Sequence, residues 1–167
     1  MYTGTHRQRL SRYNRRMNER LYTLCATLSE AELKRDRSAF FQSIHSTLNH
    51  ILRGNRPWMS RFTGRTHTPR VATGEDLFAQ FDALRAARVK LDAEFAAWVE
   101  TLDAAWLTAP FTYVSRIYNV TRTQPAWVYV THMFNHQTHH HGQVTTLLSQ
   151  LGLDPGITDI PMMPELE

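Results

Sequence analysis

Apolar residues recur every three or four positions in four separate segments of the chain, which is the pattern of amphipathic helices. The segments cover residues 10–28, 41–62, 77–102 and 125–151. The last is expected to begin at Pro125, because proline is tolerated in the first turn of a helix. Four helices of this length predict an all-α fold, a four-helix bundle, in a single domain over residues 1–167.

The ends of the middle two helices are predicted from capping residues. Asp36 or Ser38 is expected to cap the second helix, and Gly64 to end it. Thr73 and Asp76 are expected to open the third. The loop between these two helices is long enough to cross the bundle, so a simple up-down-up-down order does not follow from the pattern.

The helical pattern breaks between residues 103 and 123. Val114, Ile117, Tyr118 and Val120 favour β-structure in this segment. Short strands or an ordered loop are therefore expected there.

Composition narrows the class of protein. The 167 residues are 42% hydrophobic, which excludes a wholly disordered chain. One cysteine excludes a disulfide scaffold, and the polar first twenty residues do not resemble a secretory signal, so we expect the cytoplasm. The net charge of +4 comes mostly from arginines near the start. We interpret them as a solvated helix face and expect no nucleic-acid partner, since no nucleic-acid-binding motif accompanies them.

The last predicted helix carries an unusual set of histidines and no charged residue. Residues 123–153 contain no Asp, Glu, Lys or Arg, which indicates a helix buried on most sides. Its polar residues interrupt any apolar run long enough to span a membrane, so no membrane span is expected. Five of the nine histidines of the chain lie in one ten-residue stretch of this helix: His132, His136, His139, His140 and His141.

Helical geometry places His136 and His140 one above the other on one face, with Gln143 on the same side. Such a pair can bind one metal ion without bending the backbone. The alternative is two core histidines satisfied by hydrogen bonds. His141 points roughly away from His136, and His139 lies nearer the rim.

A metal site needs a third ligand, and the second helix offers two candidates. His45 and His50 are five residues apart, about 140° around a helix, so only one is expected to face the site. His45 lies nearer the apolar stripe, whereas His50 shares its side with small residues that include Gly54. Periodicity leaves this choice open.

Three segments resemble signatures of the DinB family of damage-inducible, YfiT-like metalloenzymes. They are NHQTHHHGQ at 135–143, SIHSTLNHIL at 43–52 and LGLDPGITD at 151–159. The resemblance covers nearly the whole chain. It implies an up-down-down-up bundle and a divalent metal ion bound by His50, His136 and His140, with His45 as the second choice for the third ligand.

The resemblance also implies a chemistry. Relatives in the family transfer low-molecular-weight thiols, so a thiol and an electrophilic substrate are the expected partners, in detoxification or stress response. Zinc is the first choice of metal, with nickel, manganese or iron as alternatives, because imidazole suits all of them. A non-catalytic metal-binding module and a metal-dependent hydrolase are the alternative functions. A homodimer is expected from the family.

No catalytic residue is assigned from the sequence. The candidates for orienting ligands or substrate are Asn49, Tyr129, Asn135 and Gln143. The chain departs from the family at His141, where arginine is frequent, and at Asn55, where aspartate is frequent. Because of the second departure, a carboxylate that assists the metal site from that position is in doubt.

Overall fold

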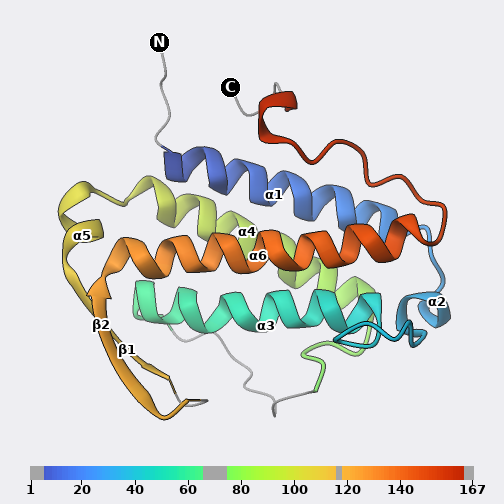
Figure 1. Cartoon of the computed structure of the whole chain (residues 1–167), viewed down its shortest axis with the longest axis horizontal. Helices are drawn as coiled ribbons and strands as arrows, with labels where there is room; N and C mark the ends of the chain where they lie inside the picture. The colour runs from blue at the N-terminus through green and yellow to red at the C-terminus, as the bar shows by residue number, and fades with distance from the viewer. Residues whose placement is uncertain (1–5, 66–74, 116–117, 164–167) are drawn as a thin grey trace.

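The computed structural model describes residues 6–65, 75–115 and 118–163, and they form a mostly helical protein. Four long helices lie side by side, and a two-stranded hairpin flanks one end of them (Figure 1). The hairpin means that the chain is helical with a small sheet rather than purely all-α. The elements are α1 (His6–Cys25), α2 (Glu30–Lys34), α3 (Ile44–Thr63), α4 (Phe81–Glu100), α5 (Ala104–Thr108), β1 (Pro110–Ser115), β2 (Val120–Pro125), α6 (Ala126–Ser149) and the 3-10 turn η1 (Ile160–Met162).

Side-chain contacts fix the relative directions of α1, α4 and α6. Asn14 donates to Gln137 at 2.6 Å, and one turn later His141 Nε2 lies 2.8 Å from Asn18 Oδ1, so α1 and α6 run in the same direction. Asn18 also donates to Asp92 at 3.0 Å. Because the start of α1 meets the end of α4, where Gln8 bonds to Glu100, these two helices are antiparallel.

The direction of α3 follows in the same way. His50 contacts His136, whereas Trp58, two turns later on α3, stacks on Tyr129 near the start of α6. These two helices are therefore antiparallel, and in Figure 1 α3 and α4 both run against α1 and α6.

The predicted start of the second long helix was wrong. Ser43 caps α3, and its Oγ accepts a hydrogen bond from Ser46 N at 3.0 Å. Asp36 and Ser38 do not cap α3, because residues 37–42 fold into a tight turn before the helix begins. The predicted end was correct: Gly64 has φ of +69°, the left-handed conformation that favours glycine.

The third long helix begins later than predicted. It starts at Phe81, and Asp76 lies in the segment before it, bound to α3. Thr73 lies outside the described residues. Asp76 therefore attaches the preceding segment to α3 instead of opening a helix.

Strands β1 and β2 pair antiparallel from Pro110 with Pro125 to Ser115 with Val120, so the expectation of short strands was correct. Of the residues that suggested them, Val114 and Val120 lie in the strands, Tyr118 lies in the turn between them, and Ile117 lies outside the described residues. The short helix α5 in the same segment was not predicted. Aromatic side chains attach the hairpin to the bundle. They include Trp58, Phe62, Trp98, Trp106, Phe111, Tyr113 and Tyr129. The hairpin leads directly into α6, whose first amide donates from Ala126 to Ala109 O at 3.0 Å.

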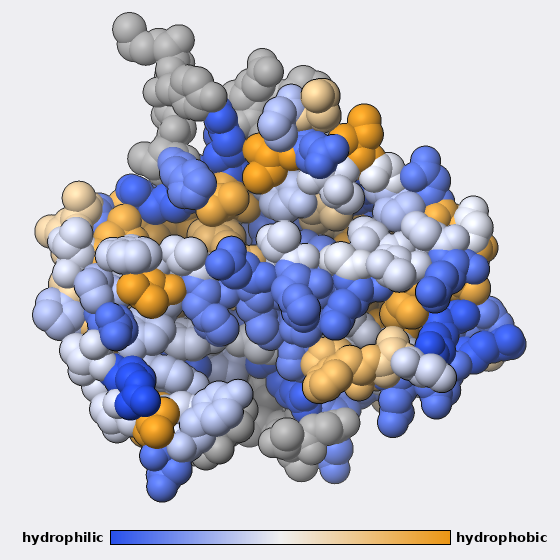
Figure 2. All heavy atoms as spheres, viewed as in Figure 1, coloured by the Kyte–Doolittle hydropathy of each residue, from blue (hydrophilic) through white to orange (hydrophobic). Residues whose placement is uncertain are grey.

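Among the described residues, no helix is both long and apolar enough to cross a bilayer. Figure 2 shows hydrophilic side chains in a band over α6, with smaller hydrophobic patches around it. One face of α6 is thus exposed, whereas the sequence predicted a helix buried on most sides. That hydrophilic band lies on the side of the molecule where α6 and α3 face the viewer.

Candidate metal centre

Three histidines from two helices converge on one point. His50 comes from α3, and His136 and His140 lie one turn apart on α6. His136 Nε2 is 3.1 Å from His50 Nε2 and 3.2 Å from His140 Nε2. All three ligand atoms lie within 4.8 Å of one another. The structure thus brings together the histidines that the resemblance implied.

The spacing of the nitrogens suits a common cation. Ligands about 2.0–2.1 Å from a tetrahedral zinc ion are about 3.3–3.4 Å apart, close to the separations found. Hydrogen bonding alone fits less well. Each neutral ring nitrogen carries either one proton or one lone pair, so His136 Nε2 cannot make two good hydrogen bonds to its neighbours. Three lone pairs directed at one cation would give all three Nε2 atoms a partner.

A hydrogen bond fixes the tautomer of His140. Its Nδ1 lies 2.7 Å from Gln143 Oε1, one turn further along α6. Nδ1 therefore carries the proton, and Nε2 keeps a free lone pair toward the other two rings. Gln143, one of the predicted orienting residues, is placed to hold a ligand ring in position.

His136 fits against the backbone of α3. A Cβ atom added at Gly54 would lie 2.7 Å from His136 Cε1, closer than real Cβ contacts. Glycine at this position therefore leaves the space that the His136 ring occupies. Gly54 is one of the small residues that the sequence places on the same side of the helix as His50.

Burial keeps the three rings neutral. Desolvation, with smaller contributions from the neighbouring histidines and, for His50, from Arg53, lowers the pKa of His50 to about 4 and that of His136 to about 3. Desolvation also lowers the pKa of His140, against the opposing effect of its hydrogen bond to Gln143. Because all three pKa values move below the ordinary value of about 6.5, the lone pairs are available at neutral pH.

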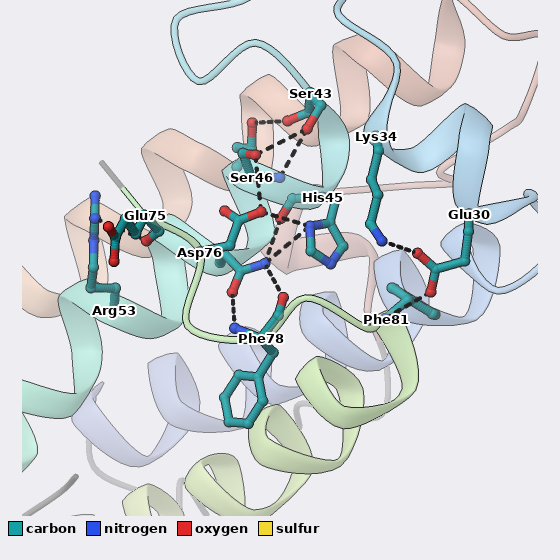
Figure 3. A network of polar contacts seen from close by, with 12 residues as sticks. Glu30, Lys34, Ser43, His45, Ser46, Arg53, Glu75, Asp76, Phe78 and Phe81 are labelled. Carbon is teal, nitrogen blue, oxygen red and sulfur yellow. Dashed lines mark hydrogen bonds and ion pairs between the residues drawn. The ribbon is translucent and has the colours of Figure 1, made fainter. Parts of the chain in front are cut away.

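His45, the second choice for the third ligand, lies outside this cluster. It is fully buried, and its Nδ1 lies 3.0 Å from Asp76 Oδ2. Figure 3 shows this contact between the start of α3 and the segment that precedes α4. His45 therefore connects these two parts of the chain and does not face His136.

The side chain of Asn49, like that of His45, binds the segment before α4. Its Nδ2 donates to Phe78 O at 3.2 Å and its Oδ1 accepts from Phe78 N at 3.0 Å. Both polar ends of the amide are thus engaged with the backbone of the segment before α4. Tyr129 is likewise engaged elsewhere, since its hydroxyl donates to Arg122 O at 3.0 Å beside the hairpin.

The remaining histidines of α6 have separate surroundings. His141 is buried and faces α1, where Asn18 Oδ1 lies 2.8 Å from its Nε2. His132, Asn135 and His139 are exposed, and the ring of His139 lies 4.7 Å from that of His140. The prediction that His141 points away from the cluster was correct.

The side chain of Asn55, where the family often has aspartate, is turned toward the bundle core. Its Oδ1 accepts from Arg88 Nη1 at 2.8 Å, and Arg88 also pairs with Asp92 at 2.7 Å. Asn55 is buried and engaged with α4. Its amide therefore serves a contact between α3 and α4.

Phe41 was not predicted as part of the site, but the structure places it beside the cluster. Its ring stacks on that of His50, with centroids 3.9 Å apart. The sequence pattern assigned this residue to the apolar stripe of the second predicted helix, so it was interpreted as a core residue. Phe41 instead precedes Ser43, the N-cap of α3, and lies outside the helix.

Comparisons with known proteins agree with this architecture. The sequence model of the DinB family matches residues 1–167. Protein DinB of Bacillus subtilis (strain 168) is 22% identical over 156 residues, which cover 90% of this chain and 89% of that protein. The crystal structure of a DinB-like protein from Bacillus cereus ATCC 10987 resembles the chain in fold, with a TM-score of 0.62 and 20% identity over 84% of this chain and 90% of the other.

Proposed function

Because the chain belongs to the DinB family over its whole length, we propose that it is a metal-dependent enzyme that transfers a low-molecular-weight thiol to an electrophile. The observation that carries this proposal is the convergence of three imidazole nitrogens, with Nε2–Nε2 separations of 3.1 and 3.2 Å. The ligands are His50, His136 and His140, and zinc is the first choice of metal, with nickel, manganese or iron as alternatives.

The donor set supports a catalytic rather than a purely structural site. Three neutral imidazoles leave a divalent ion its full charge and an open coordination position. When bound, such an ion supplies a Lewis acid that favours the thiolate form of a thiol or the ionised form of water. The chain provides the rest: Gln143 holds His140, Gly54 makes room for His136, and burial keeps the rings unprotonated.

The open side of the site is expected on the exposed face of α6. His50 and His136 are half-buried rather than fully enclosed, and His139 and Asn135 on the same helix are exposed. A small thiol can therefore reach the cluster from solvent. This accessibility favours an enzyme over a closed structural metal site.

The same family membership leads us to propose the up-down-down-up connectivity for the bundle. The shared direction of α3 and α4, opposite to α1 and α6, supports it. A homodimer remains a prediction, which light scattering of the purified protein checks.

Metal binding is tested first. Purified protein is analysed for bound metal and titrated with zinc, and His50→Ala, His136→Ala and the control His139→Ala are compared. We expect the first two variants to lose tight binding and the control to keep it. Equal zinc affinity in wild type, His50→Ala and His136→Ala would contradict the three-histidine site.

Turnover is tested next. Metal-loaded and metal-free protein are incubated with cysteine, glutathione, bacillithiol or mycothiol and a model electrophile, and thiol consumption is followed. Faster consumption only in the metal-loaded protein supports thiol transfer. Metal binding without thiol consumption favours the non-catalytic module, and metal-dependent ester cleavage without thiol favours a hydrolase.

A further inference from the structure

A tight turn before α3 places one aromatic ring directly on a metal-site histidine. The ring of Phe41 stacks on that of His50 with centroids 3.9 Å apart and an interplanar angle of 22°. Its edge also faces His140, at 5.5 Å between centroids. Phe41 therefore contacts rings from both helices that form the cluster.

Phe41 does not belong to the hydrophobic core of the described residues. Among the described residues, Phe41 packs its ring against those of Phe40, His50 and His140. Phe40, the next ring outward, is 84% exposed and is not part of the core either. The packing of Phe41 thus serves the histidine cluster and not the interior of the bundle.

His50 lacks the restraint that His140 has. His140 is held by the hydrogen bond from Nδ1 to Gln143, whereas His50 Nδ1 is buried without a hydrogen-bond partner among the described residues. Metal-binding histidines generally use their second nitrogen for such a bond, which fixes the orientation of the ring. Something else has to orient His50.

The turn that carries Phe41 is held in an unfavourable conformation. Ser38 and Gln42 have φ of +53° and +64°, a region that residues other than glycine enter at a cost of order 1 kcal/mol. Backbone hydrogen bonds of 2.8 Å from Arg37 N to Gln42 O and 2.7 Å from Gln42 N to Ala39 O close the turn. Strain maintained in this way is frequent next to functional sites.

We propose that Phe41 is a positioning residue of the metal site, which fixes the His50 ring by stacking so that Nε2 points at the ion. It does for His50 what the hydrogen bond of Gln143 does for His140. This inference rests on the proposed metal site and adds to it a residue that touches no metal.

The test is a titration of the full-length chain with cobalt(II), which substitutes for zinc and reports its coordination by its visible spectrum. Phe41→Ala is expected to weaken cobalt affinity by about 10–100-fold, the usual effect of losing a group that orients a ligand. It is also expected to change the visible bands. Phe41→Tyr, which keeps the stacked ring, should retain wild-type affinity and spectrum.

Phe40→Ala is the matched control, since it removes the same side chain from the same turn without touching His50. It should bind cobalt like the wild type. Circular dichroism and the melting temperature of the metal-free variants check that each is folded. Where Phe41→Ala fails to fold, Phe41→Leu replaces it, because leucine keeps the apolar cover but not the stacked ring.

The outcomes separate this inference from the proposed function. Tight binding by the wild type together with unchanged affinity in Phe41→Ala, or in Phe41→Leu where that variant is used, would overturn the positioning role and leave the metal site intact. Equal losses in the Phe41 and Phe40 variants would overturn it as well. Absence of cobalt binding by the wild type itself would overturn both.

Discussion

Each histidine of the cluster is held by a different neighbour. Gln143 bonds to the ring of His140, Gly54 leaves space for His136, and a ring stacks on His50. Two of these three restraints are not polar and carry no chemical signature in a sequence. A substitution at such a position changes the geometry of the site without changing its ligands.

Gly54→Ala should separate metal affinity from stability. Alanine in a helix interior is favoured over glycine by about 1 kcal/mol, but the added Cβ would lie 2.7 Å from His136 Cε1. The ring is the free end of a side chain and can swing away, so we expect a folded protein with zinc affinity lower by tenfold or more. Isothermal titration and urea denaturation of the metal-free protein measure the two effects.

Gly142→Ala is the control for that variant. Gly142 also lies within a helix, α6, but a Cβ added there would meet nothing within 4 Å. This substitution should stabilise the protein slightly and leave zinc affinity unchanged. Unchanged zinc affinity in Gly54→Ala would show that the His136 ring does not need this space.

Gln143→Leu should weaken metal binding through His140. The substitution removes the acceptor that fixes the Nδ1 proton, so the ring can rotate and its Nε2 lone pair is no longer aimed at the cluster. We expect about 10–100-fold lower zinc affinity, the usual effect of losing such a bond. The measurement is a competition titration with a zinc chelator, and equal affinities of variant and wild type would contradict the role.

At the scale of elements, α3 and α6 carry the site because each is a long, regular helix. The spacing of His136 and His140 was enough to predict that they face the same way, since one turn separates them. The third ligand could not be chosen from periodicity. His45 is buried against Asp76, and that contact depends on a segment about thirty residues further along the chain.

The helix boundaries show the same limit. Gly64 was recognised as the end of α3 because its local conformation is sufficient to explain it. The start was misplaced, since Asp36 and Ser38 are good capping residues that the turn before Ser43 uses differently. Local chemistry identifies candidate caps, and tertiary packing decides which of them is used.

Asn49→Ala should destabilise the protein without affecting the metal site. Asn49 satisfies both the N–H and the C=O of Phe78, and its removal leaves these partly buried groups unpaired. The expected loss is about 1–3 kcal/mol in the free energy of unfolding, measured by urea denaturation. A fall in zinc affinity with unchanged stability would instead return Asn49 to the group of residues that orient ligands.

At the scale of the whole molecule, a buried polar network connects all four long helices. It runs from Asn55 through Arg88, Asp92 and Asn18 to His141. Burial raises the pKa of Asp92, and the contact with Arg88 opposes this effect. No sequence pattern indicates such a network, because its members are spread over the whole chain and meet only after the helices have packed.

Acid should destabilise the metal-free protein below about pH 6.5. Burial lowers the pKa of His50 to about 4, and those of His136 and His141 to about 3. Between pH 6.5 and 3 the unfolded chain therefore binds more protons than the folded one, so the free energy of unfolding falls as the pH is lowered. Urea denaturation at several pH values measures this slope.

His141→Gln should make that slope shallower, since it removes one of the groups that stay neutral in the folded state. The substitution also disturbs the contact with Asn18, so the comparison uses the slope against pH rather than the absolute stability. A stability that is constant or rises on acidification from pH 6.5 to 4 would contradict the buried, neutral state of these histidines.

The contact between His50 and His136 joins residues that are 86 positions apart. An ion held there acts as a removable cross-link between the first and second halves of the chain, closing a large loop much as a covalent bridge does. The resistance of this protein to heat and to proteases then depends on the concentration of free metal around it, because binding to the folded state alone adds to its stability. Metal supply would thereby set how long each molecule survives as well as whether it is active.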